Sequence, residues 1–233
     1  MKKPPITIKD IARALSISPS TVSRALKNHS DISQDTKDVV NQYAKEHNYK
    51  PNTLALSLRM SKNNTIGVIV PEIVHYFFSS ILSGIEQVAD AEGYNVILCQ
   101  SDESYEKEVR NTRALVATRV SGVLASLAKH TTNYDHFQEI IDSDIPLVFF
   151  DRICIGINTD RVVVDDYAGA FAAVEYLIQS GCKRIAFFSS PPQLEISKNR
   201  KNGYLDALRK YGLKVDESLI RICDTREEAI IIT

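Results

Sequence analysis

Short apolar runs alternate with longer amphipathic segments from residue 65 onward. The runs TIGVIV, NVILC, GVLAS and PLVFF are typical of parallel strands that are buried on both faces. Helical periodicity marks the segments between them, FSSILSGIEQVADAE, YEKEVRNTRALVATR and YDHFQEIID. This order predicts βαβ units around a parallel sheet. The step from strand to helix recurs in RVVVDDYAGAFAAVEYLI, which predicts a second unit that begins near Arg161.

Residues 1–50 show helical patterns only. TIKDIARAL places Thr7 and Asp10 in capping-box spacing, which predicts the start of a first helix. A second helix is expected to begin after Ser18, with Pro19 at its first position. About three residues separate these helices, so they must cross sharply, as in a helix-turn-helix.

A third helix is predicted over QDTKDVVNQYAKEH, after a cap at Ser33. We expect Val39, Val40 and Tyr43 to face inward from this helix. The three helices would form an all-α head on the α/β core.

The second predicted helix crowds small polar residues into its N-terminal turn, the end that enters the DNA major groove in a helix-turn-helix. Pro19, Ser20 and Thr21 would allow close approach to base edges. Thr21 and Ser23 can bond phosphates, and Arg24 can reach guanine O6 and N7. A three-helix bundle without a DNA role would show the same buried stripe, and this alternative stays open.

Charge is divided unevenly along the chain. Residues 1–62 contain 11 Lys or Arg and 5 Asp or Glu, whereas the remainder contains 17 and 24. A basic head on an acidic body is expected where only the head meets a polyanion, although chance unevenness is an alternative.

Residues 51–61 predict a short linker helix. Pro51 ends the preceding segment, and Asn52 can cap the helix TLALSLRM. A helix this short is marginal in water, so it needs a partner. Two copies on DNA would bury Leu54 and insert Leu58 into the minor groove as a wedge. The alternative is an arm folded onto its own body.

The carboxyl ends of parallel strands are expected to form a ligand crevice. The candidates at these ends and in the following unit are His75, Tyr76, Phe77, Phe78, Asp102, Asp151, Arg152 and Arg200. Aromatic faces beside Asp and Arg suit a sugar or a nucleobase-like ligand. On spacing alone, an equal alternative is that the two Phe are core residues and that Asp151 and Arg152 form a surface pair.

Catalytic and metal-binding motifs are not apparent, so no catalytic residue, metal or cofactor is expected. The four cysteines lie far apart, which favours free thiols over disulfides or zinc ligands. His130 and His136 are expected in a solvated loop. No apolar run is long enough for a membrane span, and no secretory signal is evident, so a cytoplasmic protein without membrane contact is expected.

TIKDIARALSISPSTVSRALKNHSDIS followed by YKPNTLALSLR strongly resembles the lac-repressor (LacI–GalR) family of bacterial transcription regulators. The similarity continues through GVIVPEIVHYFFSSILSGIE, RVSGVL, LVFFDR and RKNGYLDAL. It implies a homodimer that binds a pseudo-palindromic double-stranded operator, with a periplasmic-binding-protein-like core that senses a small effector. The implied fold is a helix-turn-helix head (1–50), a hinge helix (51–61) and two partial α/β subdomains with parallel sheets (62–160 and 161–233), of which the second is truncated.

The residues expected at DNA are Thr7, Pro19, Ser20, Thr21, Ser23, Arg24, Asn28, Asn52, Leu58 and Arg59. Those expected at the effector are Phe77, Phe78, Asp151, Arg152 and Arg200; the resemblance supports all of these except Arg152. A sugar-binding protein or enzyme with a basic arm, or a truncated regulator without effector response, is the alternative function.

Three departures from the family pattern stand out. Ser16 occupies the tight turn where the family usually has Gly, and Leu56 stands where the linker often carries Arg. The family core also continues beyond the point corresponding to Thr233. We therefore expect a fragment or a truncated gene product whose core exposes apolar surface and binds effector weakly.

Overall fold

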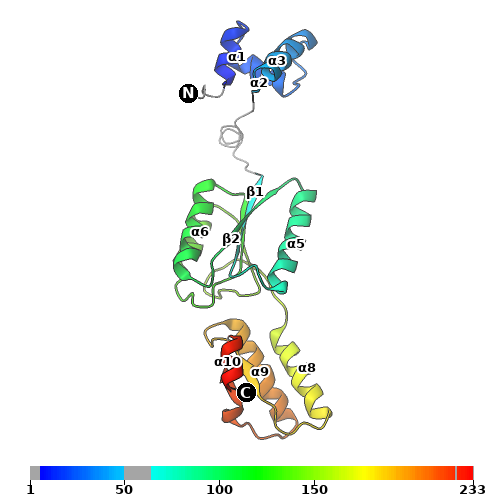
Figure 1. Cartoon of the computed structure of the whole chain (residues 1–233), viewed down its shortest axis with the longest axis vertical. Helices are drawn as coiled ribbons and strands as arrows, with labels where there is room; N and C mark the ends of the chain where they lie inside the picture. Colours follow the sequence, from blue (N-terminus) through cyan, green and yellow to red (C-terminus); the bar gives the residue numbers. More distant parts are fainter. Residues whose placement is uncertain (1–5, 50–63, 224, 233) are drawn as a thin grey trace. The chain divides into compact units, whose positions relative to one another are not determined.

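The computed structural model describes residues 6–49, 64–223 and 225–232, and the chain divides into two units, Met1–Ser61 and Lys62–Thr233 (Figure 1). In the first unit, α1 (Ile8–Ala14), α2 (Pro19–Leu26) and α3 (Gln34–Glu46) pack around one small core. Its fully buried side chains are Ile11, Val22, Ala25 and Val40. The three predicted helices are confirmed.

The prediction for Val39 is wrong, because its side chain is 53% exposed. Val40 and Ala44 are buried and Tyr43 is half-buried. These three residues form the face of α3 that packs against α1 and α2. An α-helix turns by about 100° per residue, which carries Val39 to the edge of that face.

The second unit begins with a parallel five-stranded sheet in the order β2-β1-β3-β4-β5. The strands are β1 (Thr65–Val70), β2 (Asn95–Gln100), β3 (Gly122–Ala125), β4 (Leu147–Phe150) and β5 (Asp160–Val162). They alternate with α5 (Tyr76–Ala91), α6 (Tyr105–Thr118) and α7 (Asp135–Asp142). The predicted parallel α/β fold is confirmed.

Apolar residues cover both faces of the central strands of this sheet. Along β1, Ile69 packs with the cluster of α6 and α7, whereas Val68 and Val70 pack with α5. The two helices α5 and α6 lie on opposite sides of the sheet (Figure 1). Parallel strands buried on both faces read as continuous apolar runs, which is why β1, β3 and β4 could be predicted; β2 and β5, by contrast, contain no fully buried residue.

The remaining elements are α8 (Asp166–Gln179), β6 (Phe187–Ser189), α9 (Glu195–Lys210), the short 3-10 helix η1 (Glu217–Leu219), β7 (Ile220–Ile222) and α10 (Arg226–Ile232). The strands β6 and β7 pair in parallel as a separate sheet. Tyr204 of α9 is buried against this sheet, where it stacks on Phe187, and its hydroxyl donates to the Ile185 carbonyl at 2.9 Å. The proposed boundary at residues 160–161 falls within β5, which pairs with β4.

The prediction of a solvated loop is correct for His130 and wrong for His136. The His136 side chain is 1% exposed, lies in α7, and places Nε2 3.0 Å from the Glu108 carboxylate, which is itself fully buried. The pairing partner comes from another helix, so the local pattern around His136 could not indicate its burial.

Candidate functional site

The N-terminal turn of α2 presents a cluster of hydroxyl groups. Ser18 Oγ accepts from the Thr21 amide at 3.0 Å, and it lies 2.7 Å from Ser20 Oγ and 2.8 Å from Thr21 Oγ1. Pro19 and Ser20 are exposed, whereas Thr21 is half-buried. Small side chains and the positive end of a helix dipole favour close contact with a polyanion.

The turn before α2 holds Ser16 in the left-handed region, with φ 53°. The Ile17 amide donates to the Ala12 carbonyl at 3.0 Å, which closes this turn tightly. Ser16, which stands where the family usually has Gly, therefore has a backbone conformation that glycine adopts more readily.

We expect Ser16→Gly to raise the free energy of unfolding of the head by about 0.5 kcal/mol, because relief of the left-handed strain exceeds glycine's added chain entropy. Denaturant titration followed by NMR amide signals of the head would measure the change. Ser30→Gly is the matched control, since Ser30 is exposed and not at positive φ. The explanation fails if both substitutions destabilise the head equally.

The other predicted DNA contacts in the head lie on different parts of it. Thr7 forms the capping box of α1, in which its hydroxyl lies 2.6 Å from Asp10 Oδ2. Ser23 is half-buried, and Asn28 is exposed just after α2 with φ 54°. Arg24 is exposed and paired with Asp31. Asn52, Leu58 and Arg59, with the rest of the predicted hinge helix, lie outside the described residues.

In the second unit, the carboxyl ends of the parallel strands bring several predicted effector residues together. Phe77 and Phe78 occupy the first turn of α5, and their rings meet edge to face with centroids 5.2 Å apart. Phe78 is buried in the core, whereas Phe77 is 51% exposed. Arg152, after β4, places its guanidinium carbon 5.9 Å from the centre of the Phe78 ring. Phe78 thus serves as packing and Phe77 as an exposed aromatic surface.

Arg152 is held by Glu103, a residue that sequence reasoning missed. Arg152 Nη1 lies 2.8 and 2.9 Å from the two Glu103 carboxylate oxygens, and both side chains are mostly buried. Glu103 also accepts from the Lys129 amide at 2.7 Å. One carboxylate therefore ties together the loops after β2, β3 and β4. The only signal in the sequence was its position in QSDES, directly after a predicted strand.

Asp151 and Arg200 complete this cluster. Burial raises the pKa of the Asp151 carboxyl, although the charges of Arg152 and Arg200 oppose the shift. No hydrogen bond to that carboxyl is found among the described residues. Arg200, on α9, donates from Nε to Asp166 Oδ1 at 2.6 Å. The cluster thus combines guanidinium donors, a carboxyl acceptor and an aromatic face, which suits a hydroxyl-rich ligand.

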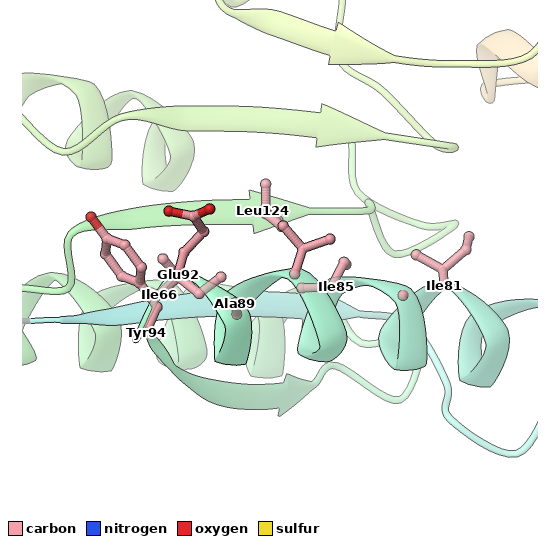
Figure 2. A pocket seen from close by; sticks show the side chains of 9 residues that line it. Ile66, Ile81, Ile85, Ala89, Glu92, Tyr94 and Leu124 are labelled. Atoms are coloured by element: carbon pink, nitrogen blue, oxygen red, sulfur yellow. The ribbon is translucent and has the colours of Figure 1, made fainter.

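A separate apolar groove of about 530 Å³ lies beside α5 and is shown in Figure 2. It is lined by Ile66, Ile81, Gly84, Ile85, Val88, Ala89, Glu92, Tyr94 and Leu124. This lining is almost entirely hydrocarbon and lacks the several polar groups that orient a sugar. The polar Asp151 cluster therefore suits a hydroxyl-rich ligand better than this groove does.

No helix in the described part of the chain is long and apolar enough to cross a membrane.

Residues 7–52 match the family described as bacterial regulatory proteins, lacI family, and residues 63–230 match the periplasmic binding proteins and sugar binding domain of LacI family. Catabolite control protein A of Priestia megaterium is 34% identical over 92% of this chain and 64% of its own length. The regulator MalR of Streptococcus pneumoniae is 34% identical over 94% of this chain and 68% of its length. This chain therefore spans about two thirds of such relatives.

Two solved structures show the same fold. A lac repressor dimer bound to operator and the anti-inducer ONPF superposes with a TM-score of 0.75 at 23% identity, over 95% of this chain and 66% of that one. A complex of the transcriptional regulator CelR with cellobiose has a TM-score of 0.65 at 25% identity, over 99% of this chain and 69% of that one.

Proposed function

Because this chain belongs to the LacI family of bacterial regulatory proteins, we propose that it is part of a sequence-specific, DNA-binding transcription regulator. The proposed regulator is a cytoplasmic repressor that binds a pseudo-palindromic operator as a homodimer. A small hydroxyl-rich effector, such as a sugar, controls it through the core. No catalytic role is proposed.

The observation that carries this proposal is the N-terminal turn of α2. The hydroxyl groups of Ser18, Ser20 and Thr21 form one polar cluster there, at the positive end of the helix dipole and on a head that is basic. A helix that packed only against its own protein would need the Ser18 cap but not the further hydroxyl groups of Ser20 and Thr21. Contact with a DNA groove requires small polar side chains, because base edges and phosphates are polar and must be approached closely.

The effector assignment rests on the cluster of Asp151, Arg152, Arg200 and the exposed Phe77. Solved relatives described as bound to cellobiose and to D-xylulofuranose support a sugar as the class of ligand. The cluster lies between strand ends and α9, so a ligand there would contact both halves of the core.

We propose that the effector acts on DNA binding through the hinge, residues 51–61, whose helix would form on operator DNA with Leu58 as the minor-groove wedge. A short helix whose stability is marginal responds to small changes in the distance between its paired copies. This part of the proposal stands on the sequence alone.

The test is selection of sites from a random duplex library by the 233-residue chain at about physiological salt. We expect enrichment of a two-fold-symmetric site. If no sequence is enriched while the chain still binds sugars, the result contradicts the regulator and favours the alternative, a sugar-binding protein with a basic arm.

A further inference from the structure

The loop between α2 and α3 folds back over Arg24. The His29 amide donates to the Arg24 carbonyl at 3.0 Å, and Arg24 Nη1 donates to Asp31 Oδ2 at 2.6 Å. The second oxygen of Asp31 lies 2.6 Å from His29 Nδ1. Both the backbone and the side chain of Arg24 are thus attached to one short loop.

The position of Asp31 in this loop is fixed from both sides. Asn28 reverses the chain with φ 54°, and Ile32 packs against the head core next to Asp31. Partial desolvation raises the pKa of the Asp31 carboxyl, but its contacts with His29 and Arg24 outweigh this effect and lower the pKa overall. Asp31 is therefore an ionised, ordered acceptor for Arg24 at neutral pH.

This pairing changes what Arg24 can recognise. A guanidinium has five N–H donors, and the hydrogen bond to Asp31 leaves enough of them for the two acceptors on a guanine edge. The neighbouring carboxylate offsets the positive charge, which weakens attraction to phosphate. It also orders a long side chain before binding, so less rotamer entropy is lost on DNA.

The sequence predicts that Arg24 reads a guanine base. We propose that Asp31 is a positioning residue that orders Arg24 for this base contact rather than for a phosphate contact. This inference rests on the proposed function, because it needs a specific DNA site. A phosphate contact would be stronger without the carboxylate, whereas a base contact needs a defined side-chain direction. The two roles therefore predict opposite effects of removing Asp31.

The experiment compares Asp31→Ala with Asp38→Ala in the full chain. Asp38 lies on α3, is exposed, and bonds Gln34 and not an arginine, so both variants remove one negative charge from the head. Their affinities are measured for the site selected by the unmodified chain and for a shuffled duplex. We expect Asp31→Ala to bind the selected site about tenfold more weakly, which is the scale of one bidentate base contact. Both variants should bind the shuffled duplex at least as tightly as the unmodified chain.

Arg24→Ala separates positioning from a structural role. Each guanine of the site is replaced in turn, and the base whose replacement no longer changes the affinity of Arg24→Ala is the one that Arg24 contacts. Replacement of that base should then also have little effect on the affinity of Asp31→Ala. In the Arg24→Ala background, Asp31→Ala should change specific affinity by less than about twofold, since coupled residues are not additive.

Two results would overturn the inference while leaving the regulator intact. One is equal specific affinity for Asp31→Ala and Asp38→Ala. The other is a tenfold loss from Asp31→Ala that persists without Arg24, which would make Asp31 a structural residue of the loop. If the unmodified chain selects no site, the proposed function fails first and the inference fails with it.

Discussion

Glu108→Ala is expected to lower the free energy of unfolding of the core by about 3–5 kcal/mol, the range seen when one partner of a buried charged network is removed. The Glu108 carboxylate accepts from the Ala128 amide at 2.6 Å and from Thr131 Oγ1 at 2.7 Å. It also lies 3.0 Å from His136 Nε2. All four residues are buried, so alanine would leave three polar groups without a partner or water.

Denaturant unfolding of the full chain, followed by circular dichroism, measures this effect. Glu108→Gln keeps a neutral acceptor and should lose about half as much stability. The matched control is Glu86→Ala on α5, where an exposed glutamate is replaced and a change within about 0.5 kcal/mol is expected. Equal stability of Glu108→Ala and Glu86→Ala would contradict the assigned role of the network.

The same substitution tests whether this network shapes the effector cluster. Glu108 holds the Ala128 amide, and Glu103 holds the adjacent Lys129 amide and Arg152. The two carboxylates thus fix consecutive residues of the loop after β3. A variant that remains folded should therefore also bind a hydroxyl-rich ligand more weakly.

Gly203→Ala is expected to destabilise the second half of the core by about 3 kcal/mol, although the same change stabilises an ordinary helix by about 1 kcal/mol. A Cβ at Gly203 of α9 would lie 2.3 Å from the Tyr167 carbonyl oxygen and 3.0 Å from the Phe171 amide nitrogen of α8. These are backbone atoms, so the clash cannot be relieved by a rotamer change. The helices must separate, which would also strain the Arg200–Asp166 pair.

Gly169→Ala provides the control, because Gly169 lies on α8 and a Cβ there would meet no atom within 4 Å. We expect it to raise the free energy of unfolding by about 1 kcal/mol through helix propensity. Thermal unfolding of both variants shows whether Gly203→Ala lowers the stability of the core and Gly169→Ala raises it. Stabilisation by Gly203→Ala would show that α8 and α9 do not pack at the spacing described.

The fold could be predicted where the determining signals are local. Ser18 and Ser33 cap their helices through side-chain bonds within three residues, and the apolar runs form the strands as expected. The limits of β6, Phe187–Ser189, do not follow from the local sequence in this way. Strand limits depend on pairing with β7, which is distant in the sequence.

The sequence indicated several residues of the candidate site but not which of them contact one another. Residues after the strands could be named because parallel strands end at one edge of a sheet. The pairs Arg152–Glu103, Arg200–Asp166 and Arg24–Asp31 join residues whose contact depends on tertiary packing. Asp165 and Asp166, for example, are neighbours in the sequence, but Asp165 caps α8 through a local bond whereas Asp166 binds the distant Arg200.

The most direct test of the central claim is the ratio of two dissociation constants of the unmodified chain. One is measured on the duplex most enriched by selection and the other on a shuffled duplex, by fluorescence anisotropy over a range of salt concentrations. A sequence-specific regulator predicts a ratio of at least about 10³ near physiological salt, with both affinities falling steeply as salt rises. A ratio near one at every salt concentration would contradict the account, because the head would then recognise only the charge of DNA.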